Sequence, residues 1–177
     1  FSADGQYMVA GCGDGTLSWW ATQSGRRLWK VQASTQAITT IAVTPDGQRA
    51  LTGSNDGNCK LWAFGKKRAL WTAIKSRKMF TPGRRRPKIK TALPRFRYEV
   101  KGIRTVAISA DGRFGAAGTS KSRIHVFDLS RFQTPAVLES HLFGVNDLAF
   151  SKDGQFLASV GGDRLVNVWR MGQYKEI

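Results

Sequence analysis

Apolar residues occur in short runs along this chain, and none of the runs keeps a helical period. The clearest runs are residues 145–151, 156–160 and 165–169. A Lys-Asp-Gly sequence ends the first run, and a Gly-Gly-Asp-Arg sequence ends the second. Short β-rich runs separated by such turn residues are typical of strands, and Asp-Gly suits the tight turn of a hairpin. We therefore predict an all-β protein in which residues 145–169 form three strands joined by turns.

The same order of strands and turns recurs four times. An Asp-Gly pair starts at residues 4, 46, 111 and 153, so successive pairs lie 42, 65 and 42 positions apart. A second turn position follows ten residues after each of these aspartates, and an aromatic residue follows sixteen residues after it. The second-turn residues are Asp14, Asp56, Lys121 and Asp163, and the aromatic residues are Trp20, Trp62, Phe127 and Trp169. Three markers in phase over four copies indicate an internal repeat, with 23 additional residues between the second and third copies.

The repeat length and the aromatic residue of the third strand resemble those of the WD-repeat β-propeller family. The resemblance implies blades of four antiparallel strands, and we predict four such blades in an incomplete ring. The blades would cover about residues 1–32, 33–75, 101–140 and 141–177, and residues 76–100 would form a basic, proline-containing insertion. The Trp-Asp pair of the family is altered in every copy, because Trp-Ala, Trp-Ala, Phe-Asp and Trp-Arg stand in its place.

The resemblance also implies a buried polar network in each complete blade. The fourth copy carries all four members: His141, Ser159, Asp163 and Trp169. The carboxylate can accept from the imidazole, the imidazole from the hydroxyl, and the hydroxyl from the indole N–H. The second copy keeps Thr52, Asp56 and Trp62 but has Ser34 in place of the histidine. The first copy keeps Asp14 and Trp20 but has Ala10 in place of the hydroxyl residue. The third copy has none of the four, because Glu99, Ala117, Lys121 and Phe127 stand at these positions. We therefore expect a full network in the fourth blade and none in the third.

Four blades are too few for a typical ring of this family. Residues 1–5 match residues 150–154, so residue 1 corresponds to the end of a first strand. An open arc would expose the apolar faces of its two end blades, which soluble proteins rarely tolerate. We expect further blades to complete the ring, from the rest of the same polypeptide or from another chain.

Positive charge is concentrated in one segment. The chain has 28 Lys and Arg against 12 Asp and Glu, a net charge of +16. Residues 75–104 alone hold twelve of the basic residues and one glutamate. The residues that could contact phosphates or carboxylates, with aromatic side chains able to stack on bases, are Arg84, Arg85, Arg86, Lys88, Lys90, Arg95, Phe96, Arg97 and Tyr98. The segment has three possible uses. It could contact RNA or DNA, it could contact an acidic protein or serve as a nuclear address, or it could be a solvated linker.

No arrangement in the sequence points to catalysis. Cys12 and Cys59 form neither a disulfide framework nor a metal spacing, and His125 has no ligand partner at a suitable spacing. The run 11–15 has glycines but lies between two strands, so it lacks the helix start of a dinucleotide loop. We expect no cofactor, no enzymatic activity and no membrane segment, because no apolar run approaches ~20 residues. The sequence favours an intracellular (cytoplasmic or nuclear) scaffold that binds proteins, or alternatively a subunit that contacts nucleic acid through residues 76–100.

Overall fold

The computed structural model describes residues 1–74, 102–133, 136–139 and 141–177, and these form fifteen strands in four antiparallel sheets. The first sheet contains β1 (Tyr7–Gly11), β2 (Thr16–Ala21) and β3 (Arg27–Gln32). The second contains β4 (Ile38–Val43), β5 (Arg49–Ser54), β6 (Cys59–Ala63) and β7 (Trp71–Ile74). The third contains β8 (Ile103–Ile108), β9 (Phe114–Thr119), β10 (Arg123–Asp128) and β11 (Ala136–Glu139). The fourth contains β12 (Val145–Phe150), β13 (Phe156–Gly161), β14 (Val166–Arg170) and β15 (Lys175–Glu176).

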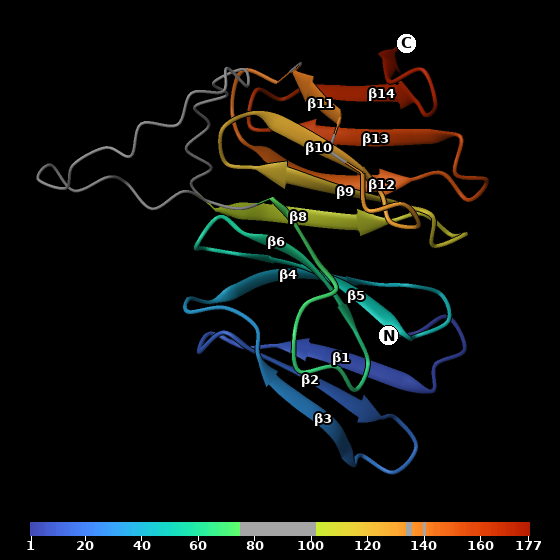
Figure 1. Cartoon of the computed structure of the whole chain (residues 1–177). Coiled ribbons are helices and arrows are strands. Elements are labelled where there is room, and N and C mark those ends of the chain that lie inside the picture. The colour runs from blue at the N-terminus through green and yellow to red at the C-terminus, as the bar shows by residue number, and fades with distance from the viewer. Residues whose placement is uncertain (75–101, 134–135, 140) are drawn as a thin grey trace, which may run out of the picture.

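The strands of every sheet follow one another in chain order. The described residues contain no helix, so the prediction of an all-β fold is confirmed. The four sheets lie one above the other in sequence order and do not close into a ring (Figure 1). The first strand β8 of the third sheet contacts the first strands of both neighbouring sheets, β4 and β12.

The core is divided into three layers, each between two successive sheets. Leu17 and Trp19 of the first sheet pack with Ile38, Ala50 and Trp62 of the second. The layer between the second and third sheets is formed by Leu51, Cys59, Leu61, Ile74, Ile103, Val106, Ala117, Phe127 and Leu129. The layer between the third and fourth sheets is formed by Ala116, Ile124, Val126, Leu138, Val145, Leu148, Leu157 and Trp169. Each internal sheet is therefore apolar on both faces, since it buries one face against each neighbour.

The Asp-Gly pairs at residues 4, 46, 111 and 153 form the turn before β1 and the turns between the first two strands of the other three sheets, and a hydroxyl group locks each turn. A serine or threonine two residues before the aspartate donates to its carboxylate: Ser2 to Asp4, Thr44 to Asp46, Ser109 to Asp111 and Ser151 to Asp153, at 2.5–2.6 Å. Each carboxylate also accepts the backbone N–H two residues further on, at 3.0 Å. The glycine has φ of 68° or 69°, a conformation that favours glycine.

Candidate protein-interaction surface

The polar side chains expected in the fourth repeat lie together between β13, β14 and the segment before β12. The Nδ1 atom of His141 lies 3.1 and 3.0 Å from the two carboxylate oxygens of Asp163. Its Nε2 atom lies 2.9 Å from Oγ of Ser159, and Nε1 of Trp169 donates to the same Oγ at 3.1 Å. Because the carboxylate can only accept, Nδ1 carries the proton, and Nε2 of the neutral imidazole accepts the serine proton.

This network is buried, and its carboxylate also orders the neighbouring loops. Burial raises the pKa of Asp163, but hydrogen bonds from the backbone N–H groups of Leu142 and Leu165 and from His141 outweigh burial and lower the pKa below its usual value. Those two N–H groups donate to Asp163 at 2.9 and 3.1 Å. One carboxylate therefore ties the loop before β12 to the turn between β13 and β14.

Gly161 makes room for this arrangement. A Cβ atom at this position would lie 2.4 Å from Nδ1 of His141 and 2.6 Å from Oδ1 of Asp163. Sequence reasoning missed this residue, because a glycine beside a turn carries no sign that an imidazole lies against it. Any side chain at position 161 would therefore clash with the hydrogen bond between His141 and Asp163.

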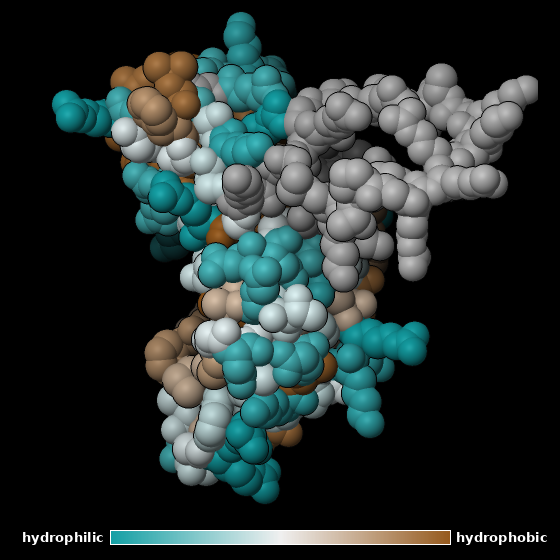
Figure 2. All heavy atoms as spheres, turned by 90° about the vertical axis from the view of Figure 1, so that its left-hand side faces the viewer, coloured by the Kyte–Doolittle hydropathy of each residue, from teal (hydrophilic) through white to brown (hydrophobic). Residues whose placement is uncertain are grey.

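The two loops that Asp163 joins present apolar side chains to solvent. Leu142 is 80% exposed, Phe143 is 64% exposed and Leu165 is 50% exposed, and Val166 at the start of β14 is 67% exposed. Hydrophobic residues gather at the end of the molecule formed by the fourth sheet (Figure 2). We call Leu142, Phe143 and Leu165 the apolar rim. Sequence analysis did not predict the rim, because short loops with leucine or phenylalanine also occur buried.

A shallow hollow of about 300 Å³ lies beside the apolar rim. It is lined by Lys121, Ser122, Arg123, Glu139, His141 and Leu142. Arg123 donates from Nε to the Glu139 carboxylate at 2.8 Å across one wall. The surface therefore combines exposed apolar side chains with charged groups of both signs, the composition that protein interfaces use.

The equivalent positions of the second repeat form two separate groups. Trp62 donates from Nε1 to Oγ1 of Thr52 at 3.1 Å, and Thr52 in turn donates to the Lys60 carbonyl at 3.3 Å. Asp56 accepts from Ser34 at 2.8 Å and also from Ser54. Ser34 thus makes the hydrogen bond to the carboxylate that the histidine makes in the fourth repeat. Its side chain is too short to reach Thr52 as well.

The described residues of the first and third repeats do not reproduce the chain of hydrogen bonds seen in the fourth. Asp14 accepts from the backbone N–H and the hydroxyl of Thr16 at 2.9 and 2.7 Å, whereas the buried Nε1 of Trp20 has no hydrogen-bond partner among the described residues. In the third repeat, Ala117 and Phe127 are buried apolar residues. Glu99 and the basic residues from Arg84 to Tyr98 lie outside the described residues. His125 of β10 is buried, and its Nε2 atom has no hydrogen-bond partner among the described residues. Burial, together with the nearby charge of Arg123, lowers the pKa of His125 to about 4.

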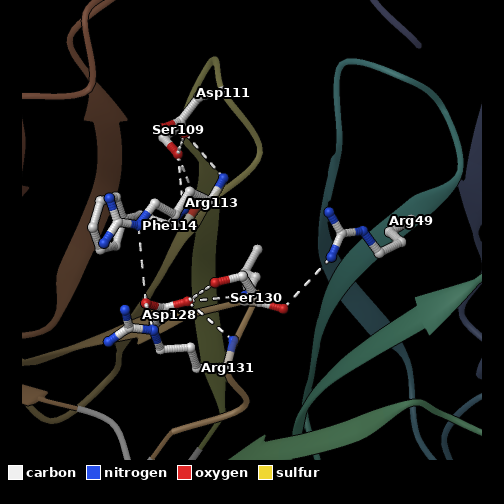
Figure 3. A network of polar contacts seen from close by, with 9 residues as sticks. Arg49, Ser109, Asp111, Arg113, Phe114, Asp128, Ser130 and Arg131 are labelled. Atoms are coloured by element: carbon white, nitrogen blue, oxygen red, sulfur yellow. Dashed lines mark hydrogen bonds and ion pairs between the residues drawn. The ribbon is translucent and has the colours of Figure 1, made fainter.

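A cluster of arginines lies around Asp128, at the end of β10 (Figure 3). The Nε atoms of Arg113 and Arg131 lie 3.9 and 3.8 Å from one carboxylate oxygen, and the side chains of these arginines are 53% and 64% exposed. The carboxylate also accepts from the Ser130 hydroxyl at 2.5 Å and from two backbone N–H groups. Arg49 of the second sheet donates to the Leu129 carbonyl at 3.5 Å. One carboxylate is shared by two arginines, so the cluster keeps a positive charge.

The described part of the chain holds no group of three or more His, Cys, Asp or Glu side chains arranged to bind a metal ion. It also holds no helix that is long and apolar enough to cross a membrane.

The model of the family described as WD domain, G-beta repeat, matches residues 1–21, 25–63 and 132–170. The first segment covers β1 and β2, the second covers β3 to β6, and the third covers β11 to β14, and together they cover more than half of the 177 residues. The third sheet lies largely outside the match, yet its four strands have the same order and the same antiparallel pairing as those of the second and fourth sheets.

Proposed function

The chain belongs to the WD40-repeat family, and we propose that it is a non-catalytic scaffold that binds partner proteins through the apolar rim. Proteins of this family typically mediate protein–protein interaction. The observation that carries the proposal is the exposure of Leu142, Phe143 and Leu165 in loops that a buried carboxylate fixes in place. Large apolar side chains grouped on a soluble surface mark sites of association.

The network beneath the rim supports binding by keeping the rim in one conformation. Loops that are ordered before association lose less conformational entropy when a partner binds. Asp163 ties both loops by their backbones and is itself held by His141, which is 5% exposed. The buried polar residues therefore act through the loops and do not touch the partner.

Comparative affinity purification tests the proposal. The full chain and a Leu142→Ser, Phe143→Ser variant would be used as baits at equal expression, with quantitative mass spectrometry as the readout. A Val137→Ser variant is the matched control, because Val137 is a 41% exposed residue on β11. We expect a set of proteins to be depleted at least tenfold by the double variant and retained by the control. Equal recovery by all three baits, with equal thermal stability, would refute the proposed surface.

A second candidate function rests on the charge of the insertion. Residues 75–104 hold twelve basic residues and one glutamate, and such a segment can bind RNA or DNA by releasing counterions from phosphates. Binding of a fluorescent single-stranded RNA should then weaken steeply as salt rises and disappear on deletion of residues 76–100. Binding that survives the deletion would show that the insertion is not the contact. An acidic peptide that competes equally well would favour an acidic protein partner.

We further propose an intracellular location, cytoplasmic or nuclear. Its support is the basic segment, which could serve as a nuclear address, and the two cysteines, which are unpaired. Imaging of a fluorescent fusion with and without residues 76–100 would separate the two compartments. Retention of nuclear signal after the deletion would rule out the insertion as the address.

A further inference from the structure

Positive charge gathers on one side of the stack of sheets. We call this side the turn face; it consists of the Asp-Gly turns and the turns between third and fourth strands, which are residues 1–6, 22–26, 44–48, 64–70, 109–113, 129–133, 151–155 and 171–174. Its basic residues are Arg26, Lys66, Lys67, Arg68, Arg113, Arg131 and Lys152. The described turns at the opposite ends of the strands hold Lys121 and Arg164 against Asp14, Asp56 and Asp163. The described positive charge is therefore concentrated on the turn face.

The aspartates of the turn face are occupied by their own turns. Each of the four accepts the serine or threonine hydroxyl and the backbone N–H described above, and the hydroxyl lowers the pKa of each carboxyl below its usual value. Their oxygens are thus used to hold the turns. The basic side chains of this face project outward from turns that are already closed.

Three arginines from two sheets meet at the junction of the second and third sheets (Figure 3). Arg113 and Arg131 lie 3.9 and 3.8 Å from the Asp128 carboxylate, and Arg49 reaches the Leu129 carbonyl at 3.5 Å. Each guanidinium has five N–H donors, yet each has one long polar contact among the described residues. Most of these donors therefore have no acceptor in the described part of the chain.

The turns do not need these arginines in order to fold. Gln6, Gln48 and Gln155 stand at the position of Arg113 in the other three repeats, and their turns have the same hydrogen bonds. Gln173 stands at the position of Arg131 in the fourth repeat. Exposed ion pairs near 4 Å add little stability, so the repeat itself does not explain the arginines.

An exposed aromatic ring lies beside the arginines. Phe132 follows Arg131 and is 46% exposed, and its ring packs edge-on against Trp71 of the second sheet with 6.1 Å between the ring centroids. The guanidinium of Arg113 lies over the Phe114 ring, 4.8 Å from its centroid. Cations with an exposed ring fit the phosphates and bases of a single-stranded nucleic acid, whereas an acidic peptide would use the cations alone.

A second basic group continues the surface across the second sheet. Lys66, Lys67 and Arg68 are exposed in the turn between β6 and β7. This turn starts beside Arg49, because Arg49 pairs with Ala63 in the sheet. Stacked sheets lie roughly 10 Å apart, and phosphates along one strand of a duplex are about 3.4 Å apart along its axis. One strand of a few nucleotides can therefore meet both basic groups.

We propose that the turn face binds a single-stranded nucleic acid at the junction of the second and third sheets. Arg113 and Arg131 contact phosphates, Phe132 stacks on a base, and the turn that holds Lys66 to Arg68 extends the phosphate contacts. The site uses neither the apolar rim nor residues 76–100, so it stands independently of both functions proposed above.

Fluorescence anisotropy of a labelled ~12-nucleotide single-stranded RNA, titrated with the full chain at several salt concentrations, tests the proposal. The test variant is Arg113→Gln, Arg131→Gln, since glutamine is the residue that other repeats carry at both positions. The charge-matched control is Lys30→Gln, Arg164→Gln, at two exposed residues outside the turn face. Phe132→Ala tests stacking, and thermal melts verify that every variant is folded.

We expect the test variant to bind about tenfold more weakly at low salt and to reduce the slope of log affinity against log salt by about 1.4, because each phosphate contact of a single strand contributes about 0.7. Phe132→Ala should weaken binding about fivefold or more and leave the slope unchanged. The control should bind like the unaltered chain. The loss caused by the test variant should be the same after deletion of residues 76–100.

Three outcomes would overturn the site. The first is no RNA binding at low salt, or equal binding by the test variant and the control. The second is a loss that occurs only when residues 76–100 are present, which would assign the contact to the insertion. The third is a polyglutamate peptide of equal charge that competes as well as unlabelled RNA while Phe132→Ala has no effect, which would identify an acidic protein as the partner.

Discussion

Replacing Ser159 by alanine tests whether the buried polar residues of the fourth sheet act as one unit. The Ser159 hydroxyl joins His141 to Trp169, at 2.9 Å from Nε2 of the histidine and 3.1 Å from Nε1 of the tryptophan. Ser159→Ala leaves both Nε2 of the histidine and Nε1 of the tryptophan buried without a partner. An orphaned buried polar atom costs about 1–3 kcal/mol, so we expect the free energy of unfolding to fall by about 3 kcal/mol.

The third sheet suggests how part of this loss can be recovered. It carries Ala117 and Phe127 at the positions of Ser159 and Trp169, and both are buried. In a Trp169→Phe background the indole N–H is absent, so Ser159→Ala orphans only the imidazole. We expect the substitution to cost about 1–2 kcal/mol there, because replacing both partners of a hydrogen bond avoids leaving one unsatisfied.

Urea denaturation followed by far-UV circular dichroism would give the four unfolding free energies of this double-mutant cycle. Far-UV detection is preferable to tryptophan fluorescence, because one variant removes a tryptophan. The predicted coupling between positions 159 and 169 is about 1–2 kcal/mol. Equal costs of Ser159→Ala in the two backgrounds would refute the shared hydroxyl, and a cost below about 0.5 kcal/mol would show that the network adds no stability.

Three further outcomes are expected. Arg164 has φ of 68° where the first and second repeats have Gly15 and Gly57, so Arg164→Gly should raise the unfolding free energy by about 0.5–1 kcal/mol in thermal melts; a decrease would contradict this. Gly118→Ala should destabilise by about 1–3 kcal/mol by overpacking against Val145, whereas the same change at the open Gly13 should cost under ~1 kcal/mol. The Ser109 hydroxyl lowers the pKa of Asp111, so its contribution is present above about pH 4 and is lost as the pH falls through the lowered pKa. Ser109→Ala should therefore reduce the drop in melting temperature between neutral and acidic pH, and an unchanged drop would exclude this role.

The positions of the repeats could be predicted from the sequence because three markers recur at fixed spacing: the Asp-Gly pair, the second turn residue and the aromatic residue. Asp46 and Gly47 predicted a turn because an Asp-Gly pair suits the backbone of a tight hairpin, and the strand that contains Trp62 followed from the aromatic marker. The serine or threonine that locks each turn was not predicted, because a hydroxyl residue near an aspartate is common in any loop. Its role became visible only in the hydrogen bond from Thr44 to Asp46.

Exposure was harder to predict than strand position. Val166 and Ile124 occupy equivalent positions with similar side chains, yet the first is 67% exposed and the second is fully buried. The difference depends on whether another sheet follows, which is a property of the assembly and not of the local sequence. The partial network of the second sheet was also beyond sequence reasoning, because Ser34 and Thr52 each look able to replace a member of the chain of hydrogen bonds.

The distribution of the polar networks follows from how each sheet is held. The described residues of the third sheet form no such chain of hydrogen bonds, but this sheet buries one face against the second sheet and the other against the fourth. The Thr119 hydroxyl bridges the turn between β9 and β10 by donating to the Arg123 carbonyl at 3.1 Å. The fourth sheet is packed on one side among the described residues, and it is there that His141, Ser159, Asp163 and Trp169 form a complete chain of hydrogen bonds. The complete chain of hydrogen bonds therefore lies in the sheet that has only one packed face among the described residues.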